Sequence, residues 1–273
     1  MDIITPIAFV FAVAAVVAAD VLDGGAIRAL INVPAMVLVL GGTMGATVMS
    51  VASSDLRKVP AYLLKVLRPK LTRVDQTIDD IAALAEVARR EGLLRLEDEL
   101  SKRTVSPFLA RGVQLIVDGA DEDRIRLLME QELSIFEARE AAGAIFFETA
   151  GGFAPTLGII GTVVGLVSVL SNLSDIQRLA PSIATAFIAT LWGVSSANLF
   201  WLPISNKMKN TLRYEVQARE MVIEGCIAIA AGQNPRLITE QLAVFREEKR
   251  TRKGAAAAAE DAEGSPELKV VGK

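Results

Sequence analysis

The stretch TAGGFAPTLGIIGTVVGLVSVLSNLS, residues 149–174, contains no charged residue and exceeds the about 20 residues that a helix needs to cross a bilayer. A second uncharged stretch, residues 179–206, follows after a short charged connection. Two more uncharged stretches lie nearer the N-terminus, at residues 29–54 and 3–19, and the stretch at residues 3–19 is the shortest of the four. The four stretches predict an all-α integral membrane protein with four transmembrane helices, the first of them running to Leu22.

The composition of the chain excludes most hydrolase mechanisms. It has no His, so imidazole catalysis and His-metal ligation are absent, and no phosphate-binding loop or nucleophile elbow occurs. The single cysteine, Cys226, offers neither a disulfide nor a zinc site and is expected to be a buried apolar residue. A formal net charge of -3 does not suggest nucleic acid as a partner. We predict no enzyme activity, no metal site and no cofactor.

The basic residues predict which parts of the chain face the cytoplasm. All but two of the 29 Lys and Arg residues lie in residues 55–148 or in residues 207–273. The other two lie in the short connections at residues 20–28 and 175–178. Because loops rich in Lys and Arg stay in the cytoplasm, both large segments and both termini are expected there, with the two connections outside.

This topology gives five segments. Residues 1–54 are a transmembrane hairpin, residues 55–148 a cytoplasmic helical domain and residues 149–206 a second transmembrane hairpin. Cytoplasmic C-terminal helices follow at residues 207–246. Residues 247–273 carry charge runs and consecutive alanines and are predicted to be a disordered tail.

Helix signals in the cytoplasmic segments are also readable. Ile78 and Ile81 begin an apolar face with helical spacing, and Gly92 is suited to end that helix. A helix near Glu122 is expected to continue without a break into the third span. The Gly- and Pro-containing loop at residues 232–236 is expected to separate two C-terminal helices.

Small residues recur at helical spacing in the last two spans and predict close helix packing. They are Ala154, Gly158, Gly161 and Gly165 in the third span, and Ser182, Ala186, Ala189, Gly193 and Ala197 in the fourth. The hydroxyls of Thr162 and Thr190 either line a wet path or bond to their own helix backbone. Pro155 and Pro203 either bend these helices or mark their ends.

No Asp, Glu, Lys or Arg lies deep in any predicted span. Cation and proton relays in membranes usually need an intramembrane carboxylate. If this protein moves ions, the carboxylate must therefore come from another chain, which predicts an obligate partner.

Four segments carry a resemblance to a known family: PAMVLVLGGTMGA at residues 34–46, APTLGIIGTVVGL at residues 154–166, ATLWGVSSANLFWLP at residues 189–203 and EGCIAIAAGQNPR at residues 224–236. Together with the order of spans and cytoplasmic segments, they resemble the flagellar motor stator subunits of the MotA/PomA family, in the MotA/TolQ/ExbB proton channel superfamily. The resemblance extends over the chain up to Phe245.

The resemblance implies a stator subunit in the bacterial inner membrane that assembles as a ring, expected to be a pentamer, in contact with membrane lipid. The ring would surround the single membrane helices of two MotB/PomB-type partners, which are anchored to peptidoglycan and supply the ion-binding Asp. Flow of H⁺ or Na⁺ would produce torque on the FliG-type protein of the rotor switch complex. Apart from the transported H⁺ or Na⁺, the stator would bind no cofactor.

The resemblance also assigns roles to individual residues. The segment RREGLLRLE, residues 89–97, is similar to the rotor-facing stretch of the family and implies rotor contacts by Arg89 and Glu97. Arg90 is an alternative to Arg89, because adjacent arginines allow a shift of one position. By spacing alone these residues would be an ordinary solvated helix face.

Pro155 and Pro203 match the two functional prolines of the family and would couple ion flow to conformational change. Thr162 and Thr190 resemble the sodium-driven branch, in which hydroxyl oxygens would replace part of the water shell of the ion. A threonine can also serve in a proton-driven member, but the positions favour sodium.

Two other functions are compatible with parts of the sequence. An ExbB/TolQ-type proton-driven energiser shares the third and fourth spans but resembles a three-span layout, so the first hairpin disfavours it. A membrane scaffold that moves no ions would use the hydroxyls for packing alone. Loss of ion flux on changing Thr190 would argue against a scaffold.

Overall fold

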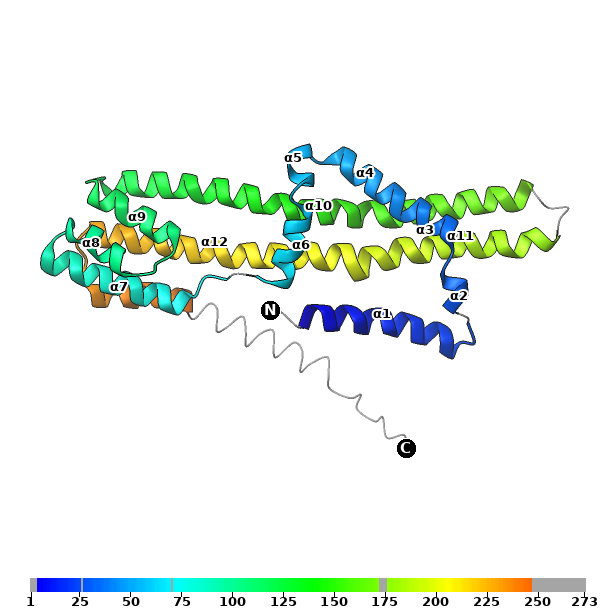
Figure 1. Cartoon of the computed structure of the whole chain (residues 1–273), viewed down its shortest axis with the longest axis horizontal. Helices are drawn as coiled ribbons and strands as arrows, with labels where there is room; N and C mark the ends of the chain where they lie inside the picture. Colours follow the sequence, from blue (N-terminus) through cyan, green and yellow to red (C-terminus); the bar gives the residue numbers. More distant parts are fainter. Residues whose placement is uncertain (1–3, 26, 70, 172–175, 247–273) are drawn as a thin grey trace, which may run out of the picture. The chain divides into compact units, whose positions relative to one another are not determined.

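The computed structural model describes residues 4–25, 27–69, 71–171 and 176–246, and all regular structure in these ranges is helical (Figure 1). Contacts divide the chain into two compact units. The first comprises Met1–Lys70 and Phe136–Arg213, and the second comprises Leu71–Ile135 and Tyr214–Lys273.

The first unit contains the apolar helices. Its elements are α1 (Ile4–Leu22), α2 (Ile27–Leu30), α3 (Val33–Met36), a π-helical turn (Val37–Gly41), α4 (Gly42–Ser50), α5 (Ser53–Leu56), α6 (Val59–Leu67), part of α10 (Glu122–Ser171), α11 (Ile176–Ser196), a second π-helical turn (Ala197–Trp201) and part of α12 (Leu202–Ala230). Its core packs Phe146 and Phe147 of α10 against Trp201, with the rings of Phe147 and Trp201 6.2 Å apart. This core joins α10 to the segment between α11 and α12.

The second unit holds the charged helices. Its elements are α7 (Val74–Glu91), α8 (Arg95–Lys102), α9 (Pro107–Val117), the remaining parts of α10 and α12, and a helix that begins at Pro235 and is described to Arg246. The core of this unit includes Ile81 of α7, Ile116 of α9 and Met221 of α12, each essentially buried. An ion pair between Arg126 and Glu224, 2.7 Å apart, joins α10 to α12 at its edge.

Within the described residues, four helical stretches are long and apolar enough to cross a membrane. They are Ile4–Leu22, Val33–Ser50, Glu122–Ser171 and Leu179–Ala230. Each overlaps one of the four uncharged stretches, and α1 ends at Leu22 as predicted. The all-helical class is therefore confirmed, while the number and direction of membrane crossings remain predictions.

The predicted helix ends in the second unit agree with the structure. Gly92 ends α7 with a φ of 89°, a left-handed conformation that favours glycine. Gly232, with a φ of 66°, follows α12 and precedes the helix that begins at Pro235. The predicted helix from Glu122 is also confirmed, because α10 runs without interruption to Ser171. The predicted tail at residues 247–273 and part of the connection at residues 175–178 lie outside the described residues.

Two helix boundaries differ from the limits of the uncharged stretches. The uncharged stretch at residues 29–54 is not one helix, because the side chain of Asn32 caps a new helix that has Pro34 in its first turn, and the helical path breaks at Val51. Pro203 does not end the fourth helix, which continues through α12 to Ala230. A π-helical turn directly precedes Pro203, and its wider hydrogen-bonding pattern accommodates the missing backbone donor.

Candidate functional site

The backbones of α10 and α11 come into direct contact at glycines. A Cβ atom on Gly193 would lie 2.6 Å from the carbonyl oxygen of Ala154, and one on Gly158 would lie 3.1 Å from the carbonyl oxygen of Ala189. Farther along, a Cβ on Gly165 would lie 2.5 Å from the Cβ of Ala186. The small residues thus serve close helix packing, as the sequence predicts.

The glycine contact brings Thr162 and Thr190 together. Their hydroxyl oxygens are within hydrogen-bonding distance of each other, from opposite helices. The Thr162 hydroxyl also lies 3.2 Å from the Gly158 carbonyl oxygen and 3.3 Å from that of Ala186, and the Thr190 hydroxyl lies 3.3 Å from the Gly158 carbonyl oxygen. Both side chains are half-buried.

Four oxygens therefore meet between α10 and α11, two from hydroxyls and two from backbone carbonyls. The two hydroxyls supply only two protons, so several oxygen lone pairs remain without a hydrogen-bond donor from this group. Such a cluster can accept a hydrogen bond from water or contribute oxygen ligands to a cation. The sequence predicted both threonines as candidates, and the structure places them side by side.

A second polar group lies farther along the same pair of helices. The Asn32 amide donates to the Thr185 hydroxyl at 2.9 Å, while the Asn32 side-chain oxygen accepts from the Ala35 backbone at 3.1 Å. Ser168 and Ser182 face each other at 3.4 Å. A groove of about 240 Å³ opens beside these hydroxyls and is lined by residues of α3, α10 and α11.

Asn32 was missed by the sequence analysis. It caps α3 and also ties the start of that helix to α11. The signal that could have identified it is an Asn just before a Val-Pro pair, which is typical of a helix start with proline in the first turn.

The two candidate coupling prolines flank a close contact between α10 and α12. A Cβ on Gly151, one turn before Pro155, would lie 2.6 Å from the side chain of Leu202, the residue before Pro203. Pro155 lies inside α10 and is half-buried, whereas Pro203 is exposed. Pro155 has no backbone N–H to donate to the Gly151 carbonyl oxygen, so α10 lacks one backbone hydrogen bond at this position and bends more easily there.

The candidate rotor-facing residues surround the turn between α7 and α8. Arg89 and Arg90 belong to the last turn of α7, Glu97 to the first turn of α8, and all three are exposed. Arg90 pairs with Glu86 at 2.6 Å. Among the described residues, neither Arg89 nor Glu97 has a recorded ion pair, and Leu94 between them is 76% exposed.

Burial is the largest cause of the raised pKa of two groups in the second unit, Asp80 and Cys226. Burial raises the pKa of the Asp80 carboxyl above its ordinary value, although nearby Arg103 opposes the shift. Burial raises the pKa of the Cys226 thiol to about 12, and its sulfur lies beside Gly112. Cys226 is thus a buried structural residue, as predicted, and not a reactive thiol.

Comparison with known proteins identifies the family of this chain. The MotA/TolQ/ExbB proton channel family matches residues 100–221. Motility protein A of Bacillus subtilis is 36% identical over 247 residues, which cover 90% of this chain and 91% of that protein. Chemotaxis protein PomA of Vibrio alginolyticus is 32% identical over 242 residues, which cover 89% of this chain and 94% of that protein.

Solved structures agree with these relatives. The flagellar MotAB stator complex from Bacillus subtilis matches with a TM-score of 0.81 and 35% identity, covering 91% of this chain and 98% of the matched chain. The C. jejuni MotAB structure matches with a TM-score of 0.83 and 27% identity, covering 90% and 96%. The chain therefore belongs to the MotA/PomA family of flagellar motor stator subunits, within the MotA/TolQ/ExbB proton channel family.

Proposed function

We propose that this stator subunit forms an ion channel with a MotB/PomB-type partner and converts a flow of sodium ions into torque on the rotor. The stator role follows from family membership, which also confirms the prediction that the chain is not an enzyme. The partner is supported by the matching structures, which are MotAB complexes.

The proposed topology has four spans in the bacterial inner membrane, with both termini and both charged segments in the cytoplasm. Four apolar helices of sufficient length and the location of nearly all Lys and Arg residues support it. The domain limits stay as predicted, with transmembrane hairpins at residues 1–54 and 149–206. We further propose a ring of these chains, a pentamer, embedded in lipid around the partner helices.

The observation that carries the ion pathway is the oxygen cluster of Thr162 and Thr190. Four oxygens between α10 and α11 can replace part of the water shell of Na⁺, and the ion needs a negative charge that the predicted spans of this chain do not supply. The Asp of the partner would supply that charge. No further cofactor or metal is proposed.

Coupling is assigned to Pro155 and Pro203. The contact of Gly151 with Leu202 links α10 to α12 between these prolines, and a missing backbone donor makes each helix easier to bend there. Thr162 follows Pro155 by about two helical turns of α10. A change at the threonine cluster would thus alter the packing of α10 against α12.

The rotor contact is assigned to Arg89 and Glu97, on either side of the exposed Leu94. Within the described part of the chain these two side chains form no ion pair, so a contact with the rotor would not have to break one there. Arg90 already pairs with Glu86, which favours Arg89 as the contact. The rotor side would be the FliG-type protein of the switch complex.

Two alternatives are less well supported. The family description includes TolQ and ExbB, but Motility protein A of Bacillus subtilis matches over about 90% of both chains. A scaffold that moves no ions would tolerate loss of the threonine hydroxyls.

The proposed function can be tested by producing this chain with its partner in cells that lack their own stator. Thr162→Val and Thr190→Val keep the side-chain shape and remove the hydroxyls, so we expect loss of ion flux and swimming with normal assembly. Thr156→Val is the matched control, because the Thr156 hydroxyl is exposed and donates to Phe153 of its own helix. Normal flux in both threonine variants would contradict the pathway and favour a scaffold.

A further inference from the structure

The short helix α6 presents apolar side chains on two opposite faces. On one face Tyr62 and Val66, 3% and 5% exposed, pack into the core that also contains Phe147 of α10. Away from this core Leu64 and Leu67 are 63% and 42% exposed. A helix that is surrounded by water carries polar residues on the face that points away from the core. The outer face of α6 therefore suits an apolar surrounding.

The helix α6 follows the end of the second apolar helix. The helical path breaks at Val51, and α6 begins at Val59. Figure 1 shows α6 running across the direction of α10 and α12. A Cβ atom on Gly143 of α10 would lie 2.8 Å from the Tyr62 side chain and 2.5 Å from that of Met208 in α12, so α6 packs where these two helices meet. On the proposed topology, α6 thus lies along the membrane surface at the cytoplasmic end of the second span.

Two arginines border the outer face of α6. Arg57 precedes the helix, Arg68 directly follows it, and both are exposed. Among the described residues neither arginine has a recorded ion pair. The nearby lysines differ, because Lys58 and Lys65 each pair with an acidic side chain, at 3.0 and 2.6 Å. The two arginines can therefore bind an anion from outside the chain without breaking an ion pair of the described residues.

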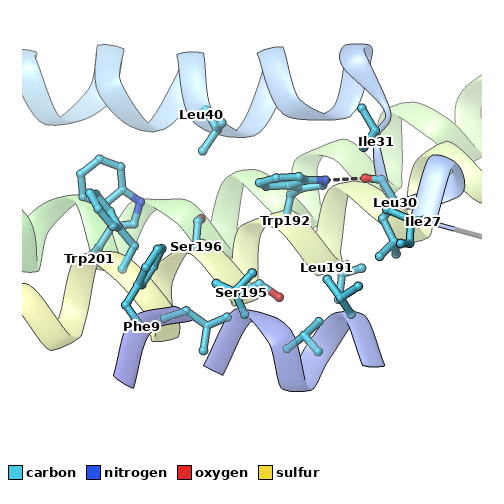
Figure 2. Close-up of a pocket in the computed structure, with 15 residues that line it drawn as sticks. Phe9, Ile27, Leu30, Ile31, Leu40, Leu191, Trp192, Ser195, Ser196 and Trp201 are labelled. Atoms are coloured by element: carbon cyan, nitrogen blue, oxygen red, sulfur yellow. Dashed lines mark hydrogen bonds between the residues drawn. The ribbon is translucent and has the colours of Figure 1, made fainter. Parts of the chain in front are cut away.

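Another uncovered apolar area of the first unit lacks such charges. A pocket of about 500 Å³ beside α1 is lined by Phe9, Trp192 and further side chains, none of which is charged (Figure 2). The Trp192 indole N–H is already bonded to the Leu30 carbonyl oxygen, at 2.8 Å. Apolar side chains alone do not distinguish one apolar occupant from another. An apolar face between two unpaired arginines is more selective, because it matches the acyl chains and the charge of an anionic lipid together.

We propose that α6 lies in the cytoplasmic surface of the membrane, with Leu64 and Leu67 among the acyl chains and Arg57 and Arg68 bound to the head groups of anionic phospholipids. The choice of leaflet rests on the proposed function, through its topology. The apolar outer face and the unpaired arginines do not depend on the ion or on the rotor. Because Tyr62 packs against α10 beside α12, the bound lipid would hold these helices where they leave the membrane.

A fluorophore attached to Leu64→Cys reports what the outer face meets. The only cysteine of the chain, Cys226, is buried and should stay unlabelled. The complete complex, with a partner freed of cysteines, is reconstituted in phosphatidylcholine vesicles. Phosphatidylglycerol or phosphatidylcholine with a nitroxide near the head of the acyl chain is then added in increasing fractions, because the nitroxide quenches the fluorophore on contact. Leu94→Cys is the matched control, since Leu94 is a 76% exposed leucine of the second unit whose label should meet water.

We expect half-maximal quenching at an about 30-fold lower fraction of nitroxide phosphatidylglycerol than of nitroxide phosphatidylcholine, since two arginines near anionic lipid contribute ~2 kcal/mol. Arg57→Gln or Arg68→Gln alone should reduce this preference to about fivefold, and both together should abolish it. Arg111→Gln is the control and should leave the preference unchanged. Arg111 is also exposed and has no recorded ion pair among the described residues, but it belongs to α9 of the second unit.

Equal quenching by both lipids would refute the anionic head groups. A label on Leu64→Cys that iodide quenches and neither lipid quenches would show that the outer face of α6 lies in water. A label that neither lipid nor iodide quenches would show that protein, such as a second copy of this chain, covers the face, which also contradicts the proposal. Thr162→Val and Thr190→Val should keep the lipid preference, so sodium flux into the same vesicles distinguishes failure of the ion pathway from failure of this proposal.

Discussion

Gly158 of α10 and Gly193 of α11 meet backbone to backbone: a Cβ atom on Gly193 would lie 3.0 Å from the Cα of Gly158. Thr162 follows Gly158 by one helical turn, and Thr190 precedes Gly193 by about one turn. The spacing that lets the two helices approach therefore also sets the distance between the two hydroxyls. Packing and the proposed ion pathway depend on the same contact.

Replacing Gly193 with Ala should separate α10 from α11. The added Cβ would lie 2.6 Å from a backbone carbonyl oxygen, which cannot move aside as a flexible side chain can. We expect a loss of about 1–3 kcal/mol of stability, the usual range for overpacking, and loss of swimming. Gly152→Ala is the control, because no atom outside its own helix turn lies within 4 Å of its Cβ position, and it should be neutral or slightly stabilising, since Ala favours a helix more than Gly does. Thermal unfolding of the detergent-solubilised complex measures both, and equal unfolding temperatures would contradict the close contact.

Charge reversal should have different effects at the two adjacent arginines, Arg89 and Arg90. We expect Arg89→Glu to impair swimming more strongly than Arg90→Glu, because Arg90 is engaged with Glu86 and Arg89 has no recorded ion pair among the described residues. Glu97→Lys should act like Arg89→Glu. All three side chains are exposed, so assembly and unfolding temperature should stay unchanged. Normal swimming of both Arg89→Glu and Glu97→Lys cells would refute the rotor contact.

Pro155→Ala tests coupling independently of stability. The change restores a backbone donor to the Gly151 carbonyl inside α10, so the unfolding temperature should rise or stay the same. If the bend is needed for coupling, swimming should nevertheless be lost. Pro181→Ala, near the start of α11, is the control and should swim normally. A fully motile Pro155→Ala strain would mean that this proline only shapes the helix.

The buried thiol of Cys226 should lower the free energy of unfolding at high pH. Its ordinary pKa of 9.0 applies to the unfolded chain, whereas burial raises the pKa to about 12 in the folded protein. Below pH 9 both states keep the thiol neutral, so its contribution is constant. Between pH 9 and 12 only the unfolded chain ionises, which lowers stability by about 1.4 kcal/mol per pH unit.

Cys226→Ala should therefore show a smaller fall in stability between pH 9 and 12 than the unchanged chain, as measured by chemical unfolding. A maleimide at pH 8 should label the thiol only after unfolding. Rapid labelling of the folded protein would contradict its burial.

Much of the fold could be predicted because apolar length and helix-ending glycines are local signals. Residues 149–174 lie largely in α10, and Gly92 ends α7. The π-helical turn before Pro203 could not be predicted, since a proline inside a helix can produce a bend, an end or a wider turn, and the local sequence does not distinguish among them. That turn explains why the fourth helix passes through a proline that the sequence suggests as an end.

The residues of the candidate site could be predicted from the sequence, but their arrangement in space could not. The sequence indicated that Thr162 and Thr190 place hydroxyl groups inside apolar helices. It did not indicate that they touch, because their contact depends on how α10 is aligned against α11, and the close approach at the glycines sets that alignment. The bond from Asn32 to Thr185 joins residues far apart in the chain and leaves only a helix-cap signal in the sequence. The roles of the rotor-facing residues came from the family resemblance, because an exposed charge has no distinctive spacing.

The most direct test of the account is the swimming speed of cells with this protein as their only stator subunit, together with its partner, as external sodium is raised at fixed pH and membrane potential. The account predicts a steep rise with sodium, and Thr162→Val and Thr190→Val should abolish that rise. Swimming that is independent of sodium and stopped by a protonophore would contradict sodium as the transported ion and reduce the threonine pair to helix packing.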